Sequence, residues 1–204
     1  ERSERTTSEG VVSIVKDGSK AAAITIACET DFVSKNEDFI NTVKDFANQV
    51  LSGTEIADAE ISDLGLKMGE NVVLKSSETL DGNVLGTYVH SNNKLGAVAI
   101  LEGGNEEIAK QIAMHVTATS PKALNKSDVD QVYIDKELAF AKEELASSNK
   151  PESIWDKILT GKESKLRSDV ALNSQSFVMN PDQTIEEFAA ANNAKVTGFR
   201  LYKI

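Results

Sequence analysis

Several residue types are scarce in this sequence, and each shortage narrows the kind of protein that it can encode. Its 204 residues include one cysteine, Cys28, so no disulfide can form within the chain, which fits a reducing compartment. No apolar run approaches the ~20 residues that a membrane-spanning helix needs, so no membrane association is expected. Aromatic residues make up 5% of the chain, so we expect a core built mainly from alanine, valine, isoleucine and leucine.

Basic residues are also in the minority. The chain has 22 lysines and arginines against 32 aspartates and glutamates, which gives a net charge of −10. Proteins that bind nucleic acid non-specifically usually carry a basic stripe, so direct nucleic-acid binding is not expected. The negative charge is compatible with a protein partner that has a basic surface.

Residues that could make a catalytic or metal site are few and poorly spaced. The histidines His90 and His115 do not combine with Cys28 into the spacing of metal ligands. Gly161-Lys162 lacks the upstream glycine and the following serine or threonine of a phosphate-binding loop. We therefore expect no metal and no cofactor, and we expect that the protein is not an enzyme.

The clearest pattern in the chain is an approximate repeat of β-hairpin, helix and strand. The first copy is predicted at residues 10–28, 36–51 and 71–79, and the second at residues 84–101, 105–117 and 195–204, with a short helix at 184–192. Residues 52–70 are expected to be a loop, and Asp17-Gly18 suits a type I′ turn. The repeat predicts an α+β fold with two related subdomains, at 1–79 and 80–204, each a small antiparallel sheet with packed helices.

An insertion in the second copy has the pattern of two helices. Its first apolar run consists of Ile134, Leu138, Ala141 and Leu145, and a similar spacing recurs over residues 154–170. Residues 147–151, which end in a proline, separate the two runs. We expect a protruding antiparallel helical hairpin with a narrow coiled-coil seam at about residues 128–170, for which Ser127 is the expected N-cap.

The segment that follows the first predicted hairpin contains an apolar ring in an unusual place. Residues 27–39, Ala-Cys-Glu-Thr-Asp-Phe-Val-Ser-Lys-Asn-Glu-Asp-Phe, lead from an apolar strand into a helix for which Asn36 is a good N-cap. Phe32 lies on the connecting loop, beside Asp31. From the residues alone, the ring either folds back onto its own helix or is presented to a partner, and Asp31 is either a capping carboxylate or a contact residue.

These thirteen residues resemble the signature of elongation factor Ts, the bacterial and organellar exchange factor for the GTPase elongation factor Tu. That family has a Thr-Asp-Phe-Val run after a cysteine-containing strand, followed by an acidic residue and a second phenylalanine. Further resemblances occur at residues 112–116 (Ile-Ala-Met-His-Val), 150–152 (Lys-Pro-Glu), 175–181 (Gln-Ser-Phe-Val-Met-Asn-Pro) and 196–199 (Val-Thr-Gly-Phe). Ser176 stands where the family usually has a proline.

The beginning of the chain differs from the family pattern. The family starts with a small three-helix domain, and no segment of this sequence matches it. The first residues, Glu1-Arg2-Ser3-Glu4-Arg5, form neither a signal peptide nor a start with methionine, so a processed or truncated product is expected.

The resemblance implies a guanine-nucleotide exchange factor that binds elongation factor Tu, displaces its Mg²⁺ and promotes GDP release during translation elongation, in the cytoplasm or an organellar matrix. It implies that four consecutive residues act at the Mg²⁺ site of the GTPase: Asp31, Phe32, Val33 and Ser34. It implies a secondary interface made by Met114, His115, Val178 and Met179. From the residues alone, His115 would be a partly buried, hydrogen-bonded histidine, and Val178 and Met179 would be core residues.

An alternative function from a different class stays open. The protein would then be a translation-associated interaction module without exchange activity. Its helical hairpin would bind another protein or form a homodimer.

Overall fold

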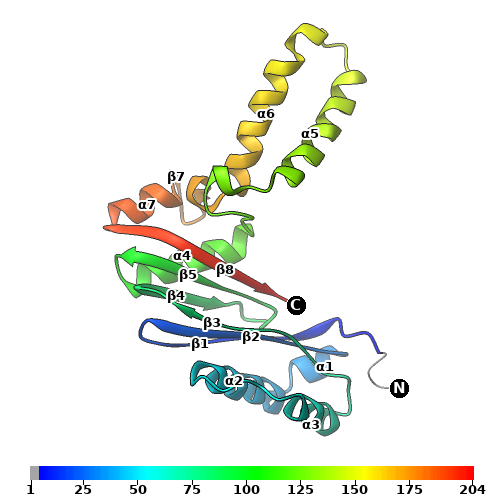
Figure 1. Ribbon diagram of the computed structural model, residues 1–204, viewed down its shortest axis with the longest axis vertical. Coiled ribbons are helices and arrows are strands. Elements are labelled where there is room, and N and C mark those ends of the chain that lie inside the picture. Colours follow the sequence, from blue (N-terminus) through cyan, green and yellow to red (C-terminus); the bar gives the residue numbers. More distant parts are fainter. Residues whose placement is uncertain (1–4) are drawn as a thin grey trace. The chain divides into compact units, whose positions relative to one another are not determined.

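The computed structural model describes residues 5–204 (Figure 1). Residues 1–4 lie outside the described residues. They make up most of the segment 1–5, on which the expectation of a processed or truncated product is based. The described chain combines helices with antiparallel sheets in the strand orders β1-β2-β3, β4-β5-β8 and β6-β7, and this confirms the predicted α+β fold. It divides into two compact units: the first runs to Ala118 and includes Asn192–Ile204, and the second is Thr119–Ala191.

The first sheet begins with the predicted hairpin. Its strands are β1 (Glu9–Asp17), β2 (Lys20–Cys28) and β3 (Val73–Asp81). Asp17 pairs with Lys20, so the loop is Gly18-Ser19 instead of the predicted Asp17-Gly18. Gly18 has a φ of +55°, whereas Ser19 is not among the described residues with positive φ. A type I′ turn needs positive φ at both loop residues, so that predicted turn type is wrong.

The helix α2 (Glu37–Leu51) forms as predicted and packs on this sheet. Asn36 caps it, because its side-chain oxygen accepts a hydrogen bond from the backbone N–H of Phe39 at 3.2 Å. The buried side chains of α2 are Phe39, Val43, Phe46, Ala47 and Val50. They form one core cluster with Ile24 and Ile26 of β2, and each such side chain contributes roughly 1.5–3 kcal/mol on burial.

The predicted loop at residues 52–70 is wrong, because a helix, α3 (Asp58–Met68), occupies most of it. The Glu60 carboxylate accepts a hydrogen bond from the N–H of Ala57 at 2.8 Å and so closes the first turn. Gly69, with a φ of +74°, ends the helix. Leu64 supplies the main buried contact, 4% exposed, so the apolar face is narrow and gives a weak sequence signal.

The second sheet consists of β4 (Val84–Val89), β5 (Leu95–Gly103) and β8 (Ala194–Lys203). The helix α4 (Glu106–Thr119) packs directly on it. A Cβ atom added at Gly86 would lie 2.0 Å from the carbonyl carbon of Ala109, so the α4 backbone and β4 are in direct contact there. Only glycine permits this approach.

The two sheets pack face to face within the first unit. The shared cluster contains Val12, Ala21, Ala23, Leu80, Leu85, Val98 and Tyr202. The unit is thus layered as α2 and α3, first sheet, second sheet and α4 (Figure 1). Both sheets belong to one compact unit. The predicted subdomain bounds at 1–79 and 80–204, with the insertion at about 128–170, stay predictions.

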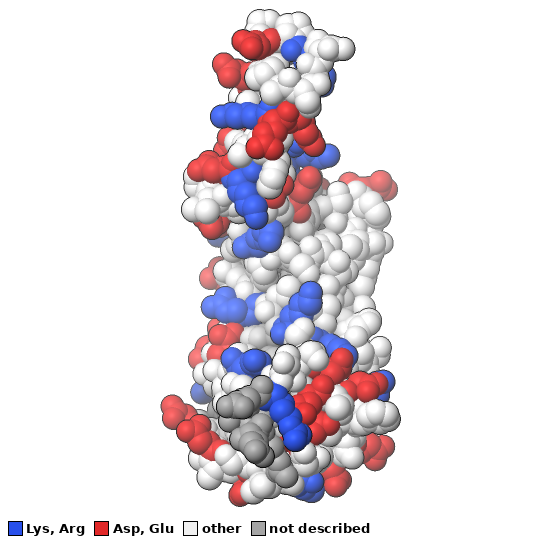
Figure 2. Space-filling view, turned by 90° about the vertical axis from the view of Figure 1, so that its right-hand side faces the viewer, with Lys and Arg blue, Asp and Glu red and all other residues white. Residues whose placement is uncertain are grey.

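The second unit contains the predicted antiparallel helical hairpin, here called the arm: α5 (Gln131–Ala146) and α6 (Trp155–Val170). Asp130, not the predicted Ser127, caps α5, since its carboxylate accepts from the N–H of Val132 at 3.0 Å. Figure 2 shows acidic and basic side chains interspersed on the arm, at the top of the view. The Lys162–Glu144 pair, at 3.2 Å, is one ion pair between the helices.

The rest of the second unit is built from short elements. They are the 3₁₀ helices Lys126–Asp128, Glu152–Ile154 and Leu172–Ser174, the strands β6 (Ser176–Phe177) and β7 (Asn180–Thr184), and α7 (Ile185–Ala191). Within residues 5–204, no helix is long and apolar enough to cross a membrane; α5 and α6 have 16 residues each.

Gly86→Ala should destabilise the first unit by about 1–3 kcal/mol, because the new methyl group collides with the α4 backbone. Gly161→Ala on α6 is the matched control, since nothing lies within 4 Å of the added Cβ. The control should be neutral or stabilising by up to ~1 kcal/mol. Urea unfolding followed by circular dichroism measures both, and an unchanged midpoint for Gly86→Ala would contradict the close approach of α4.

Candidate functional site

A short helix lies in the segment that the sequence predicted to be a loop. This helix, α1, spans four residues, Asp31–Ser34, between β2 and α2. Thr30 caps it, because its hydroxyl oxygen accepts a hydrogen bond from the N–H of Val33 at 3.4 Å. The N–H of Lys35 closes the turn on the carbonyl of Asp31 at 3.0 Å. Successive residues of a helix are rotated by about 100°, so neighbours on this turn can face different environments.

The turn exposes one apolar side chain and buries the next two residues. Phe32 is 85% exposed, whereas Val33 is 9% and Ser34 is 4% exposed. Val33 belongs to the core cluster that contains Phe39 of α2. The ring of Phe32 therefore does not fold back onto its own helix. A bulky apolar ring in water, on a turn whose neighbours are buried, is available to a partner.

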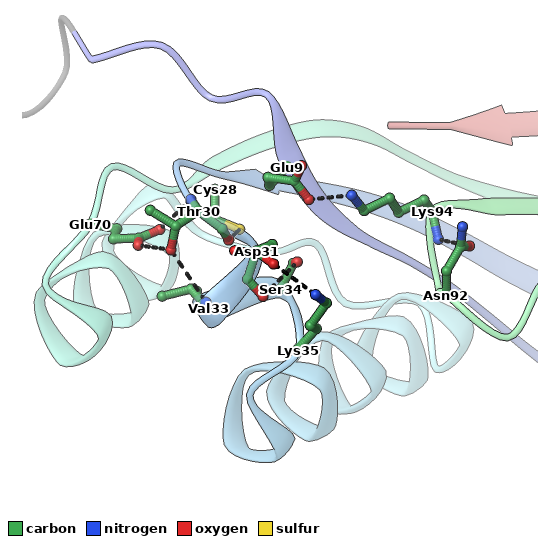
Figure 3. A network of polar contacts seen from close by, with 10 residues as sticks. All are labelled: Glu9, Cys28, Thr30, Asp31, Val33, Ser34, Lys35, Glu70, Asn92 and Lys94. Atoms are coloured by element: carbon green, nitrogen blue, oxygen red, sulfur yellow. Dashed lines mark hydrogen bonds and ion pairs between the residues drawn. The ribbon is translucent and has the colours of Figure 1, made fainter.

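Asp31 is paired within its own turn. Its carboxylate accepts a hydrogen bond from the ammonium group of Lys35 at 2.7 Å, four residues later (Figure 3). This bond and the charge of Lys35 lower the pKa of Asp31, and the same contact raises the pKa of Lys35. Thr30, not Asp31, is the capping residue, so Asp31 keeps a side-chain surface that a partner can reach.

The turn is also held from a distant part of the chain. The Glu70 carboxylate accepts hydrogen bonds from the backbone N–H groups of Glu29 and Thr30 at 3.0 and 3.1 Å, and from the Thr30 hydroxyl (Figure 3). Neither Thr30 nor Glu70 is predicted as a site residue from the sequence. A threonine before an acidic residue is a detectable capping signal. The role of Glu70 spans 40 residues and has no local signal.

Cys28, at the end of β2, is a buried apolar residue, as predicted. It is 0% exposed, and its thiol donates to the carbonyl of Thr30 at 3.4 Å. Burial, with a smaller contribution from the charge of Glu70, raises the pKa of Cys28 to about 12. The thiol is therefore protonated at neutral pH and is a poor nucleophile.

The residues expected at the secondary interface differ in exposure. Met114 and His115 lie on α4, where Met114 is half-buried and His115 is 0% exposed. Val178 and Met179 connect β6 to β7 in the second unit and are 46% and 49% exposed. They are therefore not core residues. Phe177 beside them stacks on a ring of α7 with centroids 4.3 Å apart, which anchors this hairpin.

Comparison with known proteins identifies the family. A sequence profile described as Elongation factor TS matches residues 29–204, which include the whole α1 turn. The chain belongs to the elongation factor Ts family. Members of this family are translation elongation factors, so family membership confirms the predicted role in protein biosynthesis.

Individual family members match almost the whole chain. Elongation factor Ts of Ruegeria sp. strain TM1040 is 36% identical over 216 residues, which cover 97% of this chain and 74% of the relative. The protein of Hydrogenovibrio crunogenus is also 36% identical, over 96% of this chain and 72% of the relative. The protein of Limosilactobacillus reuteri is 33% identical, over 100% of this chain and 76% of the relative.

The α1 turn combines an exposed apolar ring with a partly exposed carboxylate. The four residues expected at the Mg²⁺ site of the GTPase are consecutive on one turn, where two are buried and Phe32 projects into solvent. Among residues 5–204, no group of three or more histidine, cysteine, aspartate or glutamate side chains is placed to hold a metal ion.

Lys35→Gln should raise the pKa of Asp31 toward that of an unpaired aspartate, because both main causes of its lowering come from Lys35. An NMR titration of the Asp31 carboxyl carbon measures this. The stability that the pair contributes in the native protein is fully present above the pKa of an unfolded aspartate. It is lost as the pH falls through the lowered pKa of Asp31.

Glu60 provides an internal control in the same titration. Its pKa is lowered by the backbone N–H of Ala57 and by Gln49, not by Lys35. It should therefore keep its lowered pKa in the variant. An Asp31 pKa that does not change in Lys35→Gln would mean that the ion pair is not formed in solution.

Proposed function

We propose that this protein is a guanine-nucleotide exchange factor that binds elongation factor Tu and promotes GDP release during translation elongation. The observation that carries the proposal is the 85% exposed ring of Phe32 on a capped turn, in a chain of the elongation factor Ts family. Apolar surface of this size gains roughly 1.5–3 kcal/mol when it leaves water, so the ring is a strong candidate for a buried contact in a complex.

The proposed mechanism has no covalent step, and the protein itself is not an enzyme. The turn Asp31–Ser34 would insert beside the GDP site of the GTPase and displace the Mg²⁺ that helps to hold the nucleotide. Mg²⁺ requires near-ideal octahedral geometry, so small shifts of its ligands weaken its binding sharply. Thermodynamic linkage then applies: the factor by which this protein weakens GDP binding is also the factor by which GDP weakens binding of this protein.

One phenylalanine does not provide enough energy for this exchange. Moving an equilibrium from about 1:99 to 99:1 takes roughly 5.5 kcal/mol of differential affinity, and burying Phe32 gives roughly 1.5–3 kcal/mol. A secondary interface is therefore part of the proposal. Val178 and Met179 are exposed enough to contact the partner directly. His115 is fully buried, so any contribution from it would be indirect, through the packing of α4.

The location and partners follow from the proposed role. Translation takes place in the cytoplasm and in the matrix of organelles, and we place the protein there. A second candidate function is an interaction module without exchange, in which the arm binds another protein or a second copy of this chain. It is supported by two exposed apolar residues of α5, Val132 and Phe140, which are 74% and 53% exposed.

Phe32→Ala should slow stimulated GDP release at least about tenfold, because the buried contact that the ring would make is lost. Its free energy of unfolding should stay within ~0.5 kcal/mol of the original protein, since the ring is exposed. Release of a fluorescent GDP from elongation factor Tu, together with urea unfolding of the same variant, measures both quantities.

Leu66→Ala is the matched control for this experiment. Leu66 lies on α3 in the same unit and is 67% exposed, so its truncation also removes exposed apolar surface. The control should release GDP at the original rate. Normal release by Phe32→Ala would contradict the assignment of the ring, and no release by the original protein would favour the interaction module.

Val178→Ala and Met179→Ala should each weaken association with elongation factor Tu by ~1–2 kcal/mol, with little loss of stability. His115→Ala should instead lower the free energy of unfolding by ~1–3 kcal/mol, because its side chain is fully buried. Isothermal titration calorimetry and urea unfolding separate the two effects. If all three variants associate normally, these residues do not form a secondary interface.

A further inference from the structure

The turn that carries Phe32 is attached to a carboxylate of the α3–β3 connection. Oε2 of Glu70 accepts hydrogen bonds from the N–H groups of Glu29 and Thr30, at 3.0 and 3.1 Å. Oε1 of Glu70 accepts from the hydroxyl of Thr30. A single side chain thus satisfies three donors at the start of α1, and Figure 3 shows its carboxylate pointing to Thr30 from the neighbouring segment of the chain.

The attachment is reciprocal. The carboxylate of Glu29 accepts a hydrogen bond from the N–H of Asn71 at 2.6 Å, so each of the two segments donates backbone N–H groups to an acid of the other. Glu29 is also 3.6 Å from the guanidinium group of Arg5. The position of Glu70 is itself fixed, because its N–H donates to the carbonyl of Gly65 at 3.2 Å where α3 ends.

A chain of two hydrogen bonds connects Glu70 to the first turn of α1. A hydroxyl group has one hydrogen to donate and two lone pairs. Thr30 donates its hydrogen to Glu70, which leaves a lone pair to accept from the N–H of Val33. The carboxylate therefore fixes the rotation of the hydroxyl group that caps α1.

We propose that Glu70 is a positioning residue for Phe32, and this inference rests on the proposed exchange function. The ring is 85% exposed, so packing of the ring itself does not set its direction. Its direction comes from the backbone of α1, and Glu70 holds the residues where α1 begins. Glu70 acts through Thr30 and the turn and is not required to touch the partner.

The chemistry of the carboxylate matters for this role. Ionised Glu70 has two oxygens, both acceptors, and its bonds to N–H and O–H donors are charge-assisted. Glu70→Gln keeps the length of the side chain but removes its charge and replaces one acceptor oxygen by an NH₂ donor, so the two N–H groups and the Thr30 hydroxyl can no longer be divided between two acceptor oxygens. The variant therefore removes part of the attachment without opening a cavity.

Amide hydrogen exchange of the full chain tests the attachment without any partner. In Glu70→Gln, the amides of Glu29, Thr30 and Val33 should exchange about tenfold faster, the size of effect expected when charge-assisted hydrogen bonds are lost. The amide of Ile24 in β2 should be unchanged. Glu102→Gln, which removes the same charge from an exposed residue of β5, is the matched control. Unchanged exchange at all three amides would overturn the proposal.

GDP release from elongation factor Tu tests the connection to Phe32. Glu70→Gln should slow stimulated GDP release about tenfold, mainly by lowering the release rate at a saturating concentration of this protein. In the double variant Glu70→Gln with Phe32→Ala, the two effects should not multiply, because Glu70 acts through the turn that carries the ring. Multiplied effects in the double variant would show that Glu70 acts independently, and would overturn the proposal.

Thr30 provides a second route to the same result if Glu70→Gln fails to fold. Thr30→Ser keeps the hydroxyl and should behave as the original protein, whereas Thr30→Val should show the faster amide exchange and the slower release. Equal behaviour of the two variants would overturn the proposal. If the original protein does not release GDP at all, the exchange function is wrong, while amide exchange still decides whether Glu70 holds the turn.

Discussion

The exposure of Phe32 depends on the burial of the next two residues. When an apolar ring in water packs onto a nearby apolar surface, the free energy of the protein falls. Here Val33 belongs to the core cluster of the first sheet and Ser34 is 4% exposed, which fixes the orientation of the turn and leaves the ring outside. Hydrogen bonds at Thr30 then fix the start of the same turn. Packing on one side and polar contacts on the other together keep the ring exposed.

Much of the fold could be predicted from the sequence because its strongest elements have strong local patterns. The hairpin of β1 and β2, the helix α2 behind the Asn36 cap and the two arm helices all show clear apolar periodicity. The helix α3 could not be predicted in this way, because it contains Gly65 and exposes Leu66. With four residues, α1 is too short to show any period, and only its capping residue gives a local signal.

The candidate site was predictable only in part. Phe32 stood out because a bulky apolar residue lay on a polar connection, and the structure leaves its ring in solvent. Glu70 could not be identified from the sequence, because Thr30 lies 40 residues away. No local pattern distinguishes Glu70 from the other acidic residues of the chain, which has 32 in all. For His115, the residues alone predict partial burial, and the structure places its side chain fully inside the protein.

Four of the nine residues of β2, the middle strand of the first sheet, are alanines. Ala21, Ala22, Ala23 and Ala27 are all buried on β2, between the helix layer and the second sheet. A methyl group has no rotamers to change, so a layer of alanines cannot yield to a load by rearranging side chains. In an encounter with a partner, a force on Phe32 would therefore reach this sheet without any change of rotamer at these four positions.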